Sequence, residues 1–548
     1  MVLIEDIQSS DGFKYIGQCP DINALRQIVG TVNQKILLNE YQAGEGTGGG
    51  ELFWLNNPSL IDDSVTFFRV NSSGGWSRDL SSGIQGLWAG NILSGDATQK
   101  LNLLSTAAAN RKSSITLPNG TIKVSGTWVI NQGDDLFITG QGMGNTHLYF
   151  DATTNDPGIV VKKSDYDSHN TRTQNFTLRD LTLSGSASDV SSTTWSKRDL
   201  MHLYGVGFNF HVSNVWFYRF GRRAVYAVDL WDGDFLNCKI QSGGNDPSWT
   251  ETVYQHALCF VRDADNCNAV RITHCHFEDL QRGAIKSQDF NHSFFLMNNK
   301  FESCNSSNVF PAVHVIDVAD SFRNFVMFGG LCVLDQWAAH KHFIRISNDA
   351  SYLSGVRFTS PSRGDGAACI DVIAGEYQTG ASINCHFDVR GDLTDGNAQV
   401  VYPIKAAGMT DFSTSTVKLF NPGATFELQG QRNDISSVKV FTLGAKGTQT
   451  FVYQADASNK VRGIEMSGAI DIDGLASFTN ITSLFDAGDV AILKNMTTSS
   501  LLPGTMVSAS YLVPCDLAGN AAGSTPAGVW RAASFIPGMG VGLFERVR

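Results

Sequence analysis

A degenerate repeat in the middle of the chain constrains the fold more than any other feature of the sequence. One unit of the repeat ends in a triplet that is mostly apolar-x-apolar, and its ends run from VWF (215–217) through CKI, CHF, NKF, VMF and VRF to CHF (385–387). A second unit precedes most of these triplets and ends in aspartate, at Asp229, Asp263, Asp289, Asp317 and Asp349. Two strand motifs that alternate at one irregular period, roughly 25 to 30 residues, are typical of a solenoid.

The repeat predicts an all-β fold, a right-handed single-stranded parallel β-helix in which each coil lies about 4.8 Å above the last. Because side chains alternate across a strand, the last residue of each triplet is expected to point inward. The predicted apolar ladder is Phe217, Ile240, Phe277, Phe301, Phe328, Phe358 and Phe387. Cys238, Cys275 and Cys385 are expected to fill a neighbouring inward position as small apolar side chains.

The extent of the repeat divides the chain into three predicted parts. Residues 1–85 form a small N-terminal head or neck region, with a short helix capped by Asp21 and a glycine-rich turn beside a strand at 44–54. Residues 86–400 form the β-helix domain. Within it, a helix from Asp96, its cap, to about Arg111 comes before the first coils. The repeat fades after that, so residues 401–548 are expected to form a C-terminal β-rich domain.

Composition excludes several classes of protein. Charged residues make up 17% of the 548 residues, and there are 54 glycines and 34 phenylalanines, which argues against a disordered chain or a long coiled coil. No apolar run is long enough to span a membrane, and the first residues lack the pattern of a secretory signal. The net charge of −11 argues against nucleic acid as the main partner. The cysteines are expected to be reduced, and no metal or cofactor is predicted because no paired C-x-x-C or H-x-x-x-H element occurs.

Residues that flank the inward positions form two outward columns. The first is Trp216, Lys239, His276, Lys300, Met327, Arg357 and His386, and the second is Tyr218, Gln241, Glu278, Glu302, Gly329, Thr359 and Asp388. Such a face suits a carbohydrate chain, because sugar rings stack on aromatic side chains and sugar hydroxyls bind polar ones. The predicted substrate-binding residues are Trp216, Tyr218, His276, Lys300 and His314, with Trp249, Glu251 and Tyr254 from a loop inserted at 242–256.

Glu278 and Glu302 occupy equivalent positions on adjacent predicted coils, so their strands stand about 5 Å apart. Glycosidases use such carboxylate pairs, and Asp289, which lies between the two glutamates, is a third catalytic candidate. The alternative is structural. Lys300 and His276 would neutralise the glutamates on an ordinary solvated face, and the aspartates that end the second unit would cap turns.

Two segments carry a resemblance to a known class of protein. ITLPNGTIKVSGTWVI and FITGQGMGNTHLYF look like the start of a pectate-lyase-type β-helix, and GGGELFWLNNPSLIDDSVTFFRV with GGWSRD resembles the head-proximal region of tailed-bacteriophage tailspikes. The resemblance covers roughly residues 1–150, with the coil pattern extending it to about 400. Many relatives have a DG-x-x-D-D-T element where this chain reads LSGDATQKL.

The resemblance implies a homotrimeric tailspike, made in the host cytoplasm and carried on the virion. Its N-terminus would attach to phage tail or baseplate proteins, and its C-terminal domain would trimerise or bind glycan. Such a protein binds and depolymerises a bacterial surface polysaccharide, capsule or O-antigen, outside the host cell. No catalytic residue is carried over by motif, so Glu278 and Glu302 rest on the column argument alone.

Three functions are consistent with these residues. The favoured one is endo-glycosidic hydrolysis. The second is a polysaccharide lyase that eliminates next to a uronate. That reaction needs a base and a cation, which His276, Lys300, His314, Lys286 and Tyr226 can supply. The third is a non-catalytic receptor-binding adhesin that uses the same groove.

Overall fold

The computed structural model describes most of the chain between residues 12 and 419, and short strands beyond it. The described residues are 12–14, 17–152, 154–169, 171–185, 196–287, 291–306, 313–319, 323–334, 341–362, 367–391, 402–419, 433, 438 and the later strands given below. The chain divides into two compact units, residues 1–253 with 257–276, and residues 254–256 with 277–548.

The first unit begins with a five-stranded sheet in the order β1-β2-β3-β5-β4. Its strands are β1 (Gln18–Cys19), β2 (Lys35–Glu40), β3 (Gly48–Leu55), β4 (Phe67–Arg69) and β5 (Gly75–Arg78). Trp54 and Trp76 pack edge to face in its core, with ring centroids 5.4 Å apart. The predicted short helix is present as α3 (Ile22–Leu25), and the Ala24 N–H donates to the Asp21 carboxylate over 2.9 Å. Burial of two tryptophans gives this small sheet a core of its own.

Helix α4 (Thr98–Arg111) covers the open edge of the first coil. Leu101, Leu104 and Ala108 are buried, as the sequence predicts. The N-cap is Ala97 rather than Asp96, whose carboxylate accepts from the Thr98 N–H. The Asn102 side chain donates to the Thr127 carbonyl and accepts from the Val129 N–H, so it bonds the edge of strand β9 (Trp128–Ile130). An unpaired strand edge is a site of aggregation, and this helix protects it.

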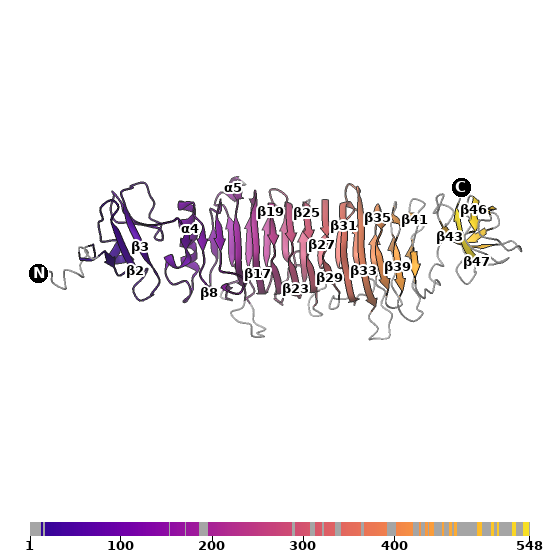
Figure 1. The fold of residues 1–548 in the computed structure, drawn as a ribbon, viewed down its shortest axis with the longest axis horizontal. Helices are drawn as coiled ribbons and strands as arrows, with labels where there is room; N and C mark the ends of the chain where they lie inside the picture. The colour runs from indigo at the N-terminus through magenta and orange to yellow at the C-terminus, as the bar shows by residue number, and fades with distance from the viewer. Residues whose placement is uncertain are drawn as a thin grey trace. The chain divides into compact units, whose positions relative to one another are not determined.

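The coils of the first unit consist of three rows of parallel strands (Figure 1). The first row is β9, β12 (Ile159–Lys162), β15 (Met201–Tyr204), β18 (Val225–Val228) and β21 (His256–Val261). The second is β10 (Phe137–Thr139), β14 (Thr177–Ser184), β17 (Phe210–Phe220), β19 (Trp231–Leu236) and β22 (Asn268–Thr273). The third is β8 (Gly120–Val124), β11 (Thr146–Phe150), the second halves of β14 and β17, and β20 (Lys239–Gly243). The remaining elements are β6 (Ile84–Gln85), η1 (Gly86–Ala89), β7 (Ile115–Thr116), α5 (Tyr166–His169), β13 (Thr173–Gln174) and β16 (Val206–Gly207).

The second unit repeats the same three rows. The first row is β24 (Gly283–Ser287), β27 (Ile316–Val318), β30 (Ile344–Ser347), β32 (Ala368–Ile373), β34 (Tyr402–Ala406), β37 (Glu427–Leu428) and β40 (Val452–Tyr453). The second is β25 (His292–Met297), β28 (Arg323–Phe328), β31 (Asp349–Ser362), β33 (Gly380–Gly391), β35 (Thr410–Ser413), β38 (Asp434–Ser436) and β41 (Lys460–Arg462). The third is β23 (His276–Leu280), β26 (Lys300–Cys304), β29 (Leu331–Val333), the second halves of β31 and β33, β36 (Thr416–Leu419), β39 (Lys439–Thr442) and β42 (Glu465–Ser467). The predicted all-β, parallel β-helical fold is therefore confirmed.

Parallel pairing of the coils continues past the predicted boundary at residue 400. The last pair joins β39 to β42, which ends at Ser467. Buried residues such as Ile404 and Val417 keep the inward positions apolar there, but the recognisable triplet endings have disappeared from the sequence. Five further strands form an antiparallel sheet in the order β44-β46-β47-β43-β45: β43 (Val490–Asn495), β44 (Met506–Ser508), β45 (Leu512–Pro514), β46 (Val529–Ala532) and β47 (Val541–Arg546).

The inward ladder is correct except at one position. Phe277 stacks on Phe301 with ring centroids 4.8 Å apart, and Phe358 stacks on Phe387 at 4.9 Å. The prediction that Phe328 points inward is wrong, because Phe328 ends β28 in the second row and is 51% exposed. Cys332 takes its place, in register with Phe301 and Phe358. Gly329 and Gly330, both with positive φ, turn the chain between β28 and β29, so the inward position falls four residues later, at Cys332, than the sequence spacing suggests.

The predicted outward columns change at the same place. Leu331, not Met327, is the register partner of Lys300 and Arg357, and Val333, not Gly329, is the partner of Thr359. The nine cysteines within the described residues are buried free thiols, as expected. Burial raises the pKa of the Cys267 thiol to about 12, which is typical of an inert core cysteine. Cys515 lies outside the described residues.

The aspartates that end the second repeat motif of the sequence, such as Asp229 and Asp317, are not register partners of one another. Asp317 is the register partner of Lys286 and of Arg345. Asp229 is fully buried and accepts hydrogen bonds from the backbone N–H groups of residues 263, 264 and 265, so it caps a turn. Asp289 lies outside the described residues.

Candidate functional site

The predicted site residues are distributed over two rows of strands. Trp216, Tyr218, His276, Glu278, Lys300 and Glu302 lie on third-row strands, in β17, β23 and β26. Trp249 and Glu251 contact Arg223 at the start of β18, in the first row, and His314 precedes first-row strand β27. The predicted site residues therefore belong to two separate surfaces, one on the third row of strands and one on the first row.

An aromatic and basic surface covers the third row of the first unit. Trp216 and Tyr218 lie two residues apart on β17, with ring centroids 4.4 Å apart. Lys239, the register partner of Trp216, places its Nζ 5.5 Å from the indole ring. The Trp216 indole N–H has no hydrogen-bond partner among the described residues. That nitrogen is buried, so the part of the half-buried Trp216 that suits a sugar is its ring, on which the apolar face of a sugar can stack.

The two candidate glutamates lie on neighbouring strands of the second unit. Strands β23 and β26 pair, and Phe277 stacks face to face on Phe301. Glu278 and Glu302 each follow one of these phenylalanines, so both carboxylates belong to the outer face. Lys300 forms an ion pair with Glu302, and both side chains are about one-third exposed or more, at 40% and 32%. Solvent can therefore reach Lys300 and Glu302, whereas one carboxylate oxygen of Glu278 is buried.

The inserted loop is anchored against the first row of the first unit. The Asp246 carboxylate is buried, accepts from the Ser248 N–H and pairs with Arg222 over 3.0 Å. Arg223 pairs with Glu251 and lies 5.2 Å from the ring of Trp249. Trp249 is only 6% exposed as a result. These contacts attach the loop to the first row, and the Glu251 side chain, which is 34% exposed, is more accessible than Trp249.

Sequence reasoning missed a polar network beneath that loop. His202 lies 2.8 Å from Asp199 through Nε2 and 3.1 Å from the Tyr204 hydroxyl through Nδ1. Its ring is 5.1 Å from that of Tyr226, the tyrosine named for a lyase. Burial alone would raise the pKa of the Asp199 carboxyl, but the hydrogen bond from His202 and the charge of Arg223 hold that pKa below its usual range. Residues 199–204 lie outside every repeat motif, so no sequence signal pointed to them.

A second network follows the first row of the second unit. Lys286 and Asp317 are both buried and paired, Nζ to Oδ2, over 2.6 Å. The register continues this alternation through Arg345, Asp371 and Lys405. Lys286 and His314, two of the candidates named for a lyase, therefore belong to one ionic system, since His314 is three residues before Asp317. No spacing in the sequence relates Lys286, Asp317 and Arg345, because they lie on three separate strands.

Three histidines gather beside this ionic system. His256 Nε2 lies 2.9 Å from the His314 carbonyl, and the rings of His314 and His342 stack at 5.6 Å. Burial lowers the pKa of His256 to about 3, of His314 to about 4 and of His342 to about 3. All three rings are therefore neutral at physiological pH. A neutral imidazole is the form of histidine that can accept a proton.

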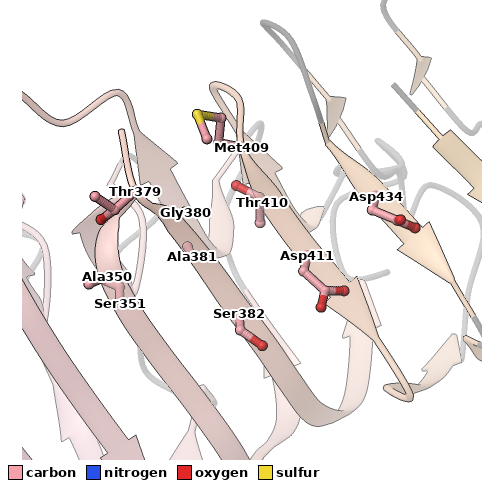
Figure 2. Close-up of a pocket in the computed structure, with 10 residues that line it drawn as sticks. All are labelled: Ala350, Ser351, Thr379, Gly380, Ala381, Ser382, Met409, Thr410, Asp411 and Asp434. Atoms are coloured by element: carbon pink, nitrogen blue, oxygen red, sulfur yellow. The ribbon is translucent and has the colours of Figure 1, made fainter. Parts of the chain in front are cut away.

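An acid-lined cavity opens on the second row of the second unit, where no residue was predicted (Figure 2). Its volume is about 460 Å³, and Ser382, Asp411 and Asp434 lie in register on three successive strands along it. Gly380 and Ala381 leave its floor free of large side chains. No sequence signal pointed to this cavity, because the repeat motif ends before Asp411.

The N-terminal sheet corresponds to a known family. Residues 18–81 match the phage tail protein small four-stranded beta-sheet domain. This chain is also 40% identical over 103 residues to the Mu-like prophage FluMu defective tail fiber protein of Haemophilus influenzae, a match that covers 18% of this chain and 16% of that protein. These matches support the resemblance to phage tail proteins drawn from the first 85 residues.

Solved structures similar to this chain include three phage proteins. They are the enzymatically active domain of bacteriophage CBA120 tailspike protein 2 (13% identity, 100% of this chain and 82% of that one, TM-score 0.48), a tailspike of Acinetobacter baumannii bacteriophage Fri1 described as a capsular polysaccharide depolymerase (13%, 96% and 95%, 0.46), and a tailspike of Acinetobacter phage vb_AbaP_AS12 (11%, 87% and 82%, 0.48). The β-helical fold itself rests on the strand pairing of this chain. Within the described residues, no helix is both long enough and apolar enough to cross a membrane.

Proposed function

We propose that this chain is a phage tailspike that binds and depolymerises a bacterial surface polysaccharide, capsule or O-antigen. The observation that carries the proposal is the order of its parts: a sheet that matches a phage tail domain over residues 18–81 precedes a parallel β-helix with an aromatic and charged outer face. The tail domain would attach the chain to the phage tail or baseplate. The protein would then be a virion component, made in the host cytoplasm, that acts outside the host cell.

The proposed reaction is endo-glycosidic hydrolysis at Glu278 and Glu302. One carboxyl group donates its proton to the oxygen of the breaking glycosidic bond. The other carboxylate either removes a proton from the attacking water or attacks the sugar carbon first. Trp216 and Tyr218 would bind sugar rings, with Asp289, His276 and Lys300 as further candidates.

Elimination at a uronate is the second candidate, and the histidine network of the second unit favours it. His314 is neutral and half-buried near the Lys286–Asp317 pair, and Arg345 lies 3.6 Å from Asp317. A neutral imidazole can remove the proton next to a uronate, while a nearby cation neutralises the uronate carboxylate.

Incubation of the full-length protein with a purified capsular or O-antigen polysaccharide tests the proposal. Hydrolysis is expected to release new reducing ends without ultraviolet absorbance from an unsaturated uronate. Appearance of that absorbance would replace hydrolysis by elimination. Retained binding without either product would leave a non-catalytic adhesin, and absence of binding to every host polysaccharide tested would contradict the tailspike proposal as a whole.

A homotrimer is part of the same proposal, with the C-terminal strands serving trimerisation or glycan binding. Each chain has a mass of 59.5 kDa. Light scattering of the purified protein is therefore expected to give about three times that mass for a closed cyclic assembly. A monomeric mass would contradict this part of the proposal.

A further inference from the structure

A second cavity lies on the outer face of the second row in the first unit. Its volume is about 360 Å³, and its lining includes Phe137, Thr177, Arg179, His211, Ser213 and Asp234. The register aligns these residues in two columns. Phe137, Thr177, His211 and Asp234 form one column, and Arg179 and Ser213 belong to the next. One cavity therefore combines an aromatic ring with basic, acidic and hydroxyl side chains.

Phe137 is the apolar surface of this cavity. It lies on β10 and is 49% exposed, although its neighbour Ile138 is fully buried. Phe208, which is 47% exposed in the same unit, instead packs edge to face on Trp231 with ring centroids 5.8 Å apart. An exposed ring inside a polar cavity offers a flat apolar contact, which the C–H face of a sugar can cover.

The polar side chains of the cavity are held in place by one another. His211 lies 2.9 Å from Asp234 Oδ1 through Nδ1 and 3.0 Å from Asn209 Oδ1 through Nε2. Arg271, the register partner of Asp234, places a guanidinium nitrogen 3.8 Å from the other carboxylate oxygen. The negative charge of Asp234 is thus surrounded by His211 and Arg271, and only 18% of its side chain is exposed.

The accessible charge in the cavity is positive. The Arg179 side chain is 57% exposed, and its ion pair with the adjacent Asp180 is loose at 3.4 Å. Arginine binds carboxylates through two parallel N–H groups, which a lysine or a hydroxyl cannot do. A ligand carboxylate near Arg179 would therefore meet a cation that solvent and ligand can both reach.

We propose that this cavity binds an acidic sugar unit of the polysaccharide, with the sugar ring on Phe137 and its carboxylate at Arg179. The sugar class rests on the proposed function, but the cavity does not include Glu278 or Glu302. It lies on β10, β14, β17 and β19 and would hold the polymer without cleaving it. His211 and Ser213 would bind sugar hydroxyls.

Saturation-transfer NMR on the full-length protein tests this assignment with defined probes. The probes are trigalacturonate, trimannuronate and a hyaluronan hexasaccharide, against the neutral galactotriose and maltotriose. At least one acidic probe is expected to bind more tightly than both neutral ones, and Phe137→Ala and Arg179→Gln are each expected to weaken that binding fivefold or more, by about 1 kcal/mol. Phe208→Ala is the matched control, since it removes an equally exposed phenylalanine outside the cavity.

The outcomes separate this inference from the proposed function. Equal loss of binding in Phe208→Ala and Phe137→Ala, or binding unaffected by both cavity variants, would overturn the site. Binding of neutral probes alone would overturn the acidic class. Acidic binding that depends on Phe137 and Arg179 in a protein that cleaves no polysaccharide would uphold the site and contradict only the enzymatic proposal. A thermal melt of each variant excludes misfolding as the cause of lost binding.

Discussion

Glu278→Gln and Glu302→Gln are each expected to abolish detectable cleavage of the host polysaccharide while leaving its binding and the assembly state intact. Glutamine keeps the size of the side chain but can neither donate nor accept the catalytic proton. Loss of general acid–base catalysis alone costs about 10²- to 10⁴-fold in rate. The ion pair between Lys300 and Glu302 is solvent-exposed, so its loss should change stability little. Initial rates of reducing-end release and equilibrium binding measure the two effects separately.

Glu376→Gln is the matched control for both glutamate variants. Glu376 is an exposed glutamate of the same unit, 3.7 Å from Arg323. Its substitution also removes one negative charge, but at a site that is not on β23 or β26. Its turnover should remain near that of the unmodified protein. Near-normal turnover in both Glu278→Gln and Glu302→Gln would contradict the catalytic assignment, and loss of activity in His314→Gln instead would favour elimination.

The phenylalanine ladder shows what the repeat could predict. Phe277, Phe301, Phe358 and Phe387 were identified from the triplets alone, because a buried position in a coil tolerates few side chains and recurs at each turn. The prediction failed at Phe328, where a two-glycine turn divides one coil differently from the others. Repeats of unequal length therefore predict the kind of residue that lies inside more reliably than the strand on which it lies.

The ionic and histidine networks could not be predicted for the same reason. Lys286 and Asp317 lie opposite each other only because the segment from β24 to β27, which includes β25 and β26, has a particular length, and the triplets do not constrain that length. Phe137, His211 and Asp234 come from three separate strands, and no spacing in the sequence relates them. The sequence thus predicted the scaffold and the residue types of the surface proposed to bind glycan. Which residues share a surface depended on register.

The second unit is expected to lose stability steeply between about pH 6.5 and pH 4. In the unfolded chain a histidine takes up a proton near pH 6.5. In the folded chain, burial holds the pKa of His256 and His342 to about 3 and of His314 to about 4. The unfolded state therefore binds more protons throughout this interval, and stability that is complete above pH 6.5 is lost as the pH falls.

The size of the effect follows from the number of histidines. Each contributes about 1.4 kcal/mol per pH unit, so the three together give an upper limit of about 4 kcal/mol per pH unit. Guanidinium unfolding midpoints, followed from pH 7.5 to 4.5, should fall accordingly. His256→Gln should reduce the slope by about a third, whereas His386→Gln, at an exposed position, should leave it unchanged.

Asp317 provides an internal check on the cause of this loss. Burial opposes its charge, but Lys286 holds the pKa of the Asp317 carboxyl below its usual range, so the stability that this pair contributes is lost only as the pH falls below about 4. The carboxylate and the histidines therefore act in separate intervals. A midpoint that stays constant from pH 7 to 5 and falls only below pH 4 would assign acid sensitivity to the carboxylates and contradict the neutral histidine cluster.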